Sequence, residues 1–311
     1  MIKKKVFIDG KIGTVALHLE ERISDRDDVE ILSLPKDMLK DMDARKEILN
    51  EADFVFLCLP DSAAKGAVAM IDNLDTVVID TSSAHRNSPA WAYGFPELSG
   101  EFEEKIKKSR RISLPGSQAS GFNALIYPLI KAGLLSKDTP IIAHSMTGYS
   151  EGGLDMICAY EAGNRSALLS APRQYGLNQS SVALKESVKL MELSHDPILC
   201  PYVADYYSGM TLTVPLFKSQ LIRGGIDHIK AVYRTVYNTP LVYFNENPKE
   251  EHFVSARALS TKDSMQIEVH GNDEKILLVA KYDNLGKGSV GAAIECLNIK
   301  MGCAYTKSLD I

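Results

Sequence analysis

Apolar residues in the first 83 positions gather in short, continuous runs that alternate with amphipathic segments. Four runs are rich in Val, Ile, Leu and Phe, at residues 3–9, 29–34, 52–60 and 76–83. Continuous runs of this length are typical of strands that are buried on both faces. Three segments between them have apolar positions at helical spacing, at residues 14–25, 42–51 and 61–71. Strands that alternate with helices in this way predict an α/β fold with a doubly wound parallel sheet.

The pattern changes after about Pro115. Apolar and polar side chains alternate in TLTVPLF, SMQIEVHG and KILLVAKYD, as they do in half-exposed antiparallel strands. The turn residues GNDE lie between the last two of these runs, so residues 264–283 predict a hairpin. This change in period indicates a second domain of the α+β type.

The C-terminal segment GKGSVGAAIECLNIKMG places its apolar residues on one helix face. We expect this helix to pack back on the first domain. The predicted organisation is therefore a doubly wound domain at 1–115, completed by a C-terminal helix at 286–311, and an α+β domain at 116–285.

Composition and charge exclude several classes of protein. Hydrophobic residues make up 45% of the 311 residues and charged residues 24%, which excludes disordered and low-complexity chains. The 35 Lys and Arg residues do not exceed the 40 Asp and Glu residues, so we expect no nucleic-acid partner. No apolar run is long enough to span a bilayer, and no signal peptide is recognisable, so we expect a cytoplasmic protein without membrane contact. The five cysteines form no C-x-x-C pair, which argues against a metal site or a disulfide framework.

The segment GKIGTVA follows the first predicted strand and opens the first predicted helix. Small residues at Gly10 and Gly13 let the backbone approach a pyrophosphate, and the helix that begins at Thr14 and Val15 favours negative charge at its N-terminus. The segment therefore predicts a dinucleotide site. The alternative is a tight turn between strand and helix without a ligand.

The second predicted strand ends in Ile-Leu-Ser-Leu, without the acid that normally binds the ribose hydroxyls of NAD. This favours NADP, with Ser33 as a donor to the 2′-phosphate or, alternatively, as a strand-end cap. Cys58, Leu59, Pro60 and Ser82 follow the third and fourth predicted strands. Because ligands bind at the carboxyl ends of parallel strands, we expect these residues to line the dinucleotide crevice.

Two further segments carry candidate chemistry. Ser117 follows Pro-Gly near the N-terminus of a helix predicted at 122–135, where it would stabilise an anion or an oxyanion, or simply cap the helix. Residues 144–153 end a predicted strand in a loop of small and polar residues, including Tyr149 and Gly152, that suits the wrapping of a substrate or a plain connection.

Two charged or polar positions near predicted strand ends suggest contacts to anions or to the cofactor. Arg86 lies just beyond the fourth predicted strand, where it would clamp a carboxylate or phosphate, although a solvated loop arginine is the default. Asn284 opens the last predicted helix and is a candidate contact to the cofactor. Arg86 and the loop at 144–153 together predict a small anionic substrate.

Nine ordered motifs resemble one enzyme family: GKIGTVA, FLCLP, DTSSAHR, YGFPEL, PGSQASGF, TGYSEGG, APRQYGLNQ, ADYYSGM and YDNLGKG. They resemble N-acetyl-γ-glutamyl-phosphate reductase in its shorter, type 2 form, from Ile8 to Gly302. The resemblance implies a semialdehyde-dehydrogenase architecture, with an NADP-binding Rossmann domain and an α+β domain that carries catalysis and subunit contacts. It also implies a homodimer or a homotetramer.

In that family a cysteine after Pro-Gly attacks the acyl phosphate, phosphate leaves, and NADPH delivers hydride to the thioester, giving N-acetylglutamate semialdehyde. A histidine of an H-x-H segment acts as acid and base. The resemblance places Ser117 at the cysteine position and Ser181 and Ala183 at the histidine positions. Because a serine hydroxyl is a far weaker nucleophile than a thiolate, and a seryl ester is a poorer hydride acceptor than a thioester, these substitutions argue against the covalent route.

Three functions remain open from the sequence. The first is an NADP-dependent oxidoreductase of this reductase type, in amino-acid (arginine) biosynthesis. The second is a diverged enzyme that passes hydride directly to a carbonyl or imine, with Ser117 and Tyr149 as hydrogen-bond donors to the developing oxyanion. The third is a non-catalytic paralogue that binds NADP or a metabolite.

Overall fold

The computed structural model describes residues 3–10, 13–35, 38, 41–248, 250 and 252–311. The chain forms two compact units. The first unit comprises Met1–Pro96, Gly100–Gly116 and Ala292–Leu309. The second unit comprises Glu97–Ser99, Ser117–Gly291 and Asp310–Ile311.

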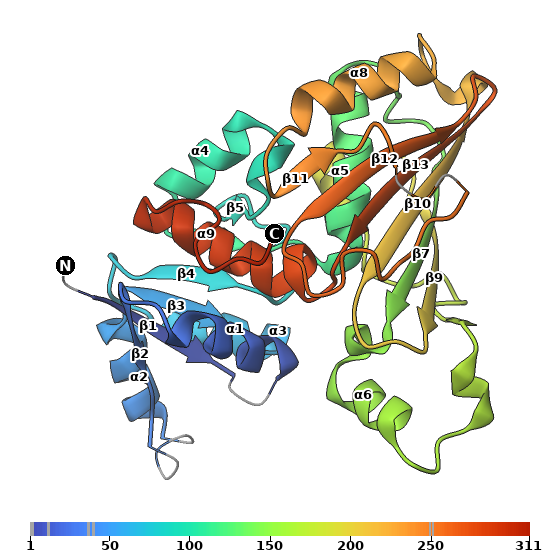
Figure 1. Cartoon of the computed structure of the whole chain (residues 1–311). Helices are drawn as coiled ribbons and strands as arrows, with labels where there is room; N and C mark the ends of the chain where they lie inside the picture. Colours follow the sequence, from blue (N-terminus) through green and yellow to red (C-terminus); the bar gives the residue numbers. More distant parts are fainter. Residues whose placement is uncertain (1–2, 11–12, 36–37, 39–40, 249, 251) are drawn as a thin grey trace. The chain divides into compact units, whose positions relative to one another are not determined.

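The first unit contains a six-stranded sheet in the order β2-β1-β3-β4-β6-β5, and every pair in it is parallel (Figure 1). Its strands are β1 (Lys4–Asp9), β2 (Val29–Leu32), β3 (Phe54–Leu57), β4 (Val77–Asp80), β5 (Ala92–Tyr93) and β6 (Arg111–Ser113). Its helices are α1 (Thr14–Ser24), α2 (Met42–Glu51), α3 (Asp61–Met70), α4 (Gly100–Lys108) and α9 (Gly291–Met301). The predicted doubly wound parallel sheet is confirmed.

The two central strands of this sheet are buried because most of their side chains are apolar on both faces. Every residue of β3 and β4 is buried, and Val55, Leu57 and Val78 pack in one core with Leu49 of α2 and Ala64 of α3. The strands are shorter than the apolar runs, since pairing stops where the chain turns toward the next helix. Lys11 and Ile12, in the middle of the GKIGTVA segment, lie outside the described residues.

The second unit contains a seven-stranded mixed sheet in the order β11-β12-β13-β10-β7-β9-β8. Its strands are β7 (Ile142–Gly148), β8 (Arg173–Gln174), β9 (Ile198–Ala204), β10 (Met210–Phe217), β11 (Val242–Phe244), β12 (Met265–Gly271) and β13 (Lys275–Tyr282). Its helices are α5 (Ser117–Lys131), α6 (Gly153–Glu161), α7 (Lys185–Met191) and α8 (Ile226–Val236). Figure 1 shows α5 and α8 lying along this sheet. The predicted hairpin is confirmed, because β12 and β13 pair antiparallel from Met265↔Tyr282 to Gly271↔Ile276.

Two expected elements differ from the structure. The helix predicted at 122–135 begins earlier, at Ser117, because the small polar segment before Phe122 is itself helical, and Gln118–Leu129 is buried. The loop predicted at 144–153 is regular structure instead: β7 runs to Gly148, a 3₁₀ turn spans Tyr149–Gly152, and α6 follows. Gly148 serves the close approach of two chain segments, because a Cβ there would lie 2.4 Å from the carbonyl oxygen of Tyr207.

The C-terminal helix predicted at 286–311 is also not one helix. A π turn spans Gly286–Val290, α9 follows, and the helix ends before Gly302, whose φ of +66° is typical of the residue after a helix. Within the part of the chain that the structure describes, no helix is long and apolar enough to cross a membrane. No group of three or more His, Cys, Asp or Glu side chains among the same residues is placed to hold a metal ion.

Candidate active site

A cavity of about 580 Å³ in the first unit lies at the carboxyl ends of β1 and β3. It is lined by Phe7, Ile8, Asp9, Gly10, Gly13, Leu34, Arg45, Cys58, Leu59, Pro60 and Ala63. Five residues predicted to contact the cofactor therefore meet here: Gly10, Gly13, Cys58, Leu59 and Pro60. Gly10 has a φ of +108°, and a Cβ on it would lie 2.2 Å from the carbonyl oxygen of Cys58. Only glycine fits this conformation and this contact.

The N-terminus of α1 adjoins this cavity through Gly13. Gly13 is the N-cap of α1, and its lack of a side chain leaves the first helical N–H groups without a side-chain acceptor. Thr14 and Val15 form the first turn, and the buried hydroxyl of Thr14 has no hydrogen-bond partner among the described residues. A phosphate group fits such a helix terminus, because the exposed N–H groups and the helix dipole both favour negative charge.

Three other predicted cofactor residues do not line this cavity. Ser33 follows directly after β2, whereas Ser82 uses its N–H and its hydroxyl to bind the carboxylate of Asp80, at 2.9 Å each. Asn284 belongs to the second unit, where its amide oxygen accepts the N–H of Gly209 and its amide nitrogen donates to the hydroxyl of Ser150. Asn284 therefore joins two chain segments of that unit.

Arg45 on α2 is a cavity residue that the sequence reasoning missed. Its Nε and Nη2 donate to Oδ2 of Asp9, at 3.0 Å and 2.6 Å, and Asp9 is the last residue of β1. Nη1 of Arg45 has no hydrogen-bond partner among the described residues. A clue was present in the sequence, because a cation near the start of the helix after the second strand is placed to reach a 2′-phosphate.

Cys58 lines the same cavity but is not a nucleophile. Burial raises the pKa of its thiol to about 12, against a weaker opposing effect of a hydrogen bond with Thr81. The thiol is therefore neutral at physiological pH and acts as part of the apolar wall.

Arg86 is held at the carboxyl ends of β4 and β6 in the first unit. Its Nε donates to the carbonyl of Leu114 at 2.9 Å, and its Nη2 donates to the carbonyl of Thr81 at 3.1 Å. The neighbouring His85 places Nδ1 2.6 Å from Oδ2 of Asp80 and stacks on Trp91. Two main-chain acceptors thus fix the orientation of the Arg86 guanidinium, and its contact to an anion stays a prediction.

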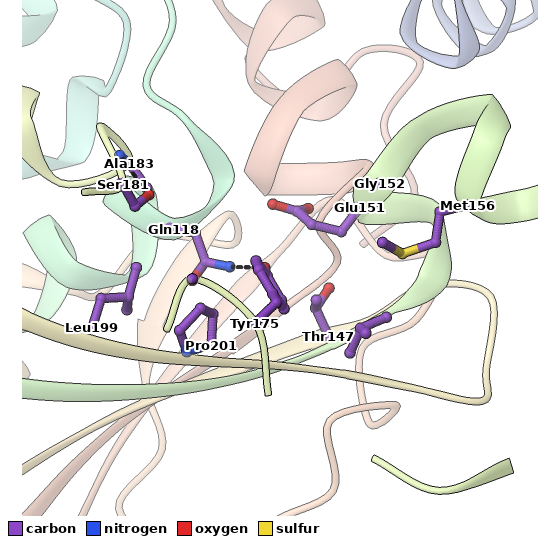
Figure 2. A pocket seen from close by; sticks show the side chains of 12 residues that line it. Gln118, Thr147, Glu151, Gly152, Met156, Tyr175, Ser181, Ala183, Leu199 and Pro201 are labelled. Carbon is purple, nitrogen blue, oxygen red and sulfur yellow. Dashed lines mark hydrogen bonds between the residues drawn. The ribbon is translucent and has the colours of Figure 1, made fainter. Parts of the chain in front are cut away.

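A second cavity, of about 240 Å³, lies within the second unit (Figure 2). It is lined by Gln118, Thr147, Glu151, Gly152, Met156, Tyr175, Gly176, Ser181, Ala183, Leu199, Pro201 and Val203. Ser181, Ala183 and Gly152, which the sequence analysis singled out in two distant motifs, are thus brought to one cavity. Because Ser181 and Ala183 are small, their side chains leave the space open.

Ser117 adjoins this cavity through Glu151. It is the first residue of α5, and its hydroxyl donates a hydrogen bond to Oε1 of Glu151. The hydroxyl of Tyr282 donates to the main-chain carbonyl of Ser117 at 2.7 Å and fixes the start of the helix. The expected position of Ser117 near a helix N-terminus is confirmed, whereas its chemical role stays a prediction.

Tyr149 does not line this cavity. Its hydroxyl donates to Glu161 at 3.3 Å, and its ring stacks on Tyr160 and meets Tyr207 edge-on. Burial raises the pKa of Tyr149, and the negative charge of Glu161 adds to this effect. The interactions of Tyr149 are therefore those of an aromatic cluster.

Three cavity residues were missed by the sequence reasoning: Gln118, Glu151 and Tyr175. Gln118 is only 5% exposed, and its amide nitrogen donates to the hydroxyl of Tyr175 at 3.3 Å. Burial raises the pKa of Tyr175, and the negative charge of Glu151 raises it further, so this phenol is neutral. A signal was present, because Gln118 and Glu151 each lie inside a motif that drew attention to its neighbours.

The chemistry of this cavity differs from that of a covalent acyl site. Among the described residues that line it, Glu151 is the only charged side chain, and none is a cysteine or a histidine. The walls are mainly apolar, from Met156, Leu199 and Val203 among others. Neither a thiolate nor an imidazole is therefore supplied by its lining.

Two family models match the chain, one in each unit. The model described as semialdehyde dehydrogenase, NAD binding domain, matches residues 19–109. The model described as semialdehyde dehydrogenase, dimerisation domain, matches residues 118–284.

Solved structures share this fold at low sequence identity. Aspartate semialdehyde dehydrogenase II from Vibrio cholerae has a TM-score of 0.74 and 14% identity, over 97% of this chain and 99% of that chain. Aspartate semialdehyde dehydrogenase with NADP from Candida albicans has a TM-score of 0.66 and 14% identity, over 96% of this chain and 98% of that chain. These likenesses establish the semialdehyde-dehydrogenase fold.

Several curated relatives have a higher sequence identity to this chain than these structures do. An N-acetyl-γ-glutamyl-phosphate reductase of Mesorhizobium japonicum is 37% identical over 97% of this chain and all of its own length. One of Chelativorans sp. is 38% identical over 96% of this chain and 98% of its own length. One of Brucella ovis is 37% identical over 97% of this chain and all of its own length. The chain therefore belongs to the N-acetyl-γ-glutamyl-phosphate reductase family and is an oxidoreductase with a semialdehyde-dehydrogenase NAD-binding domain.

Proposed function

We propose that this protein transfers hydride between NADP and a carbon–oxygen or carbon–nitrogen double bond of a small anionic substrate, without a covalent enzyme intermediate. One observation carries the proposal. The hydroxyl of Ser117 is bound to the carboxylate of Glu151 beside a cavity whose described lining has no thiol and no imidazole. Direct hydride transfer needs neither group, because the substrate carbon accepts the hydride without first forming a thioester.

The cavity of the first unit fits the cofactor. The glycine-only backbone at Gly10 and the helix terminus at Gly13 would take the pyrophosphate. Arg45 in the cavity lining, together with Ser33 directly after β2, would bind the 2′-phosphate that distinguishes NADP from NAD. When bound there, the cofactor supplies the hydride or accepts it.

The residues at the N-terminus of α5 would position the reacting double bond. The helix N-terminus and the Ser117 hydroxyl offer polar contacts to its heteroatom, and the apolar walls of the neighbouring cavity exclude water. Arg86, whose guanidinium is held by two main-chain carbonyls, would bind an anion.

We also propose that the protein acts as a homo-oligomer in the cytoplasm. Residues 118–284 match a family described as a dimerisation domain, which supports a homodimer, alone or within a homotetramer. The five cysteines are all free thiols, as is usual in a reducing compartment.

The direct test follows NADPH absorbance with the unmodified protein and N-acetyl-γ-glutamyl phosphate, N-acetylglutamate semialdehyde, simple carbonyls or imines. Cofactor binding is measured in the same sample by fluorescence. We expect turnover with at least one substrate, no acyl adduct in the intact mass, and residual turnover in Ser117→Ala. An acyl adduct on Ser117 would overturn direct transfer. Tight cofactor binding without turnover of any of these substrates would leave the non-catalytic paralogue instead.

A further inference from the structure

The polar atoms that the second-unit cavity offers to a ligand include two hydrogen-bond acceptors. Gln118 is 95% buried, its amide nitrogen already donates to Tyr175, and its amide oxygen Oε1 has no partner among the described residues. A buried acceptor that is left unsatisfied is energetically unfavourable. The cavity therefore favours a ligand with an N–H or O–H donor at this point.

The second acceptor is the carboxylate of Glu151. Figure 2 shows Glu151 reaching toward the cavity from one side and Gln118 from the other. The hydroxyl of Ser117 holds one carboxylate oxygen in place. Since no lysine, arginine or histidine is among the described lining residues, the charge that the cavity itself presents is negative.

A negative charge affects the two classes of hydride acceptor in opposite ways. Reduction of a carbonyl builds negative charge on oxygen in the transition state, and a carboxylate at the site opposes this charge. A protonated imine already carries positive charge, which the same carboxylate stabilises, and its N–H supplies the donor that Gln118 lacks. The pattern of acceptors and charge thus selects nitrogen over oxygen.

Building on the proposed function, we infer that the cavity binds a protonated imine, whose carbon is the hydride acceptor. Hydride adds to the carbon of the C=N bond, and the π electron pair becomes the lone pair of nitrogen. The product is the amine, the nicotinamide ring is left oxidised, nothing leaves the substrate, and the amine takes its final proton from solvent.

The size and the walls of the cavity suit a small ring. A cavity of about 240 Å³ with Met156, Leu199 and Pro201 in its walls accepts an apolar ring of five or six atoms. The small side chains of Ser181 and Ala183 leave room for substituents. The substrate class that fits this cavity is therefore the cyclic imines.

The test compares 2-methyl-1-pyrroline with cyclopentanone and N-acetylglutamate semialdehyde as substrates for the full-length protein. NADPH consumption gives kcat and KM, and mass spectrometry identifies the amine or alcohol product. We expect kcat/KM for the imine to exceed that for the ketone. Glu151→Gln should lower the imine value about tenfold to a hundredfold, as expected for loss of one charge-assisted contact, without lowering that of a carbonyl.

Two further variants separate the contact from a folding defect. Gln118→Met keeps the volume but removes the acceptor, so the KM for the imine should rise while NADPH affinity is unchanged. Glu161→Gln changes an exposed acid at the end of α6, outside the cavity, and should change neither substrate's values by more than about twofold.

Each outcome decides between the inference and the proposed function. Preference for the imine that depends on Glu151 supports the inference. Turnover of a carbonyl but not of the imine overturns the inference and leaves direct hydride transfer standing. Bound NADPH with no turnover of any probe overturns both.

Discussion

The two cavities of this protein present opposite chemistry. In the first unit, Gly10 and Gly13 shape a cavity that contains the Arg45–Asp9 ion pair beside a helix N-terminus. In the second unit, the lining has one charged group, the carboxylate of Glu151, among apolar walls. The first arrangement attracts phosphate, whereas the second attracts a cation or a hydrogen-bond donor.

The largest effect should come from Gly10→Ala. A Cβ would lie 2.2 Å from the carbonyl oxygen of Cys58, at a φ of +108° that alanine rarely adopts. We expect the free energy of unfolding to fall by about 2–4 kcal/mol and NADPH affinity to fall about a hundredfold. Thermal unfolding and NADPH fluorescence measure the two effects.

The matched control for this change is Gly66→Ala. Gly66 lies on α3 outside the cavity, its φ is not positive, and no heavy atom of the described residues lies within 4 Å of a Cβ built on it. We expect affinity within about threefold of the unmodified protein. If Gly10→Ala binds NADPH as tightly as this control, the first-unit cavity is not the dinucleotide site.

Two carboxylates of the second unit have different roles: Glu151 lines the cavity that would hold the ligand, whereas Glu268 stabilises the fold. Glu268 is only 1% exposed. Burial alone would raise its pKa, but hydrogen bonds from His270, Lys281 and Asn245 outweigh burial and hold the pKa at about 2. Because the folded pKa lies below the unfolded value of about 4.3, this group stabilises the fold above that pH and loses its contribution as pH falls toward 2.

Glu268→Gln should therefore lower the free energy of unfolding by about 3 kcal/mol at pH 7 and flatten its dependence on pH between about 2 and 4.3. Urea unfolding at several pH values measures both effects. Glu246→Gln is the control, because Glu246 pairs with Arg234 on the exposed surface and should leave stability unchanged within error. An unchanged pH dependence in Glu268→Gln would contradict the assignment.

Arg45→Met should reduce NADP affinity about tenfold to a hundredfold, because one charge-assisted contact to the 2′-phosphate is lost. NAD affinity should change by less than about threefold, since NAD lacks this phosphate. Calorimetry at two salt concentrations measures both cofactors. Lys46→Met is the control, because Lys46 is the next residue on α2 and pairs with Asp72 at the surface. Equal losses of affinity for NAD and NADP would show that Arg45 does not bind the 2′-phosphate.

Some features of the two cavities can be predicted from the sequence, and others cannot. The parallel sheet and the role of Gly10 depend on signals within a few residues: a continuous apolar run, then a glycine before a helix. Arg45 reaches the cavity only because β1 is paired so that Asp9 ends beside the start of α2. The local sequence gives only a hint of this contact, a cation near the start of the helix after the second strand, and does not show the strand pairing that completes it.

The second cavity was harder to predict for the same reason. Gln118 comes from α5, Glu151 follows β7, and Tyr175 follows β8, and the sheet order brings them together. Glycines at 148–153 were interpreted as signs of a loop, whereas Gly148 permits close contact with the Tyr207 segment. The resemblance drew attention to Ser181 and Ala183, which line this cavity, whereas the contacts of the neighbouring Gln118 and Glu151 were visible only in the structure.

A thiol placed at residue 117 would report the charge of the second cavity directly. In Ser117→Cys, the carboxylate of Glu151 should raise the pKa of the new thiol, in opposition to the helix N-terminus. We expect alkylation by iodoacetamide at pH 7 to be about tenfold slower than in Ser117→Cys with Glu151→Gln. Peptide mass spectrometry separates residue 117 from the five natural cysteines. Equal rates would remove the electrostatic argument for a protonated imine.

The smallest effect should come from Tyr149→Phe. The substitution removes a hydrogen bond to Glu161, at 3.3 Å, but keeps the ring that stacks on Tyr160. Because Tyr149 does not line the second cavity, turnover of imine and carbonyl probes should change by less than about twofold. Steady-state NADPH consumption provides the measurement, with Glu161→Gln as the partner variant. A tenfold loss of turnover confined to Tyr149→Phe would support the role predicted from sequence, in which this hydroxyl donates to the reacting group. The substrate could then not be inferred from the acceptors of the second cavity alone.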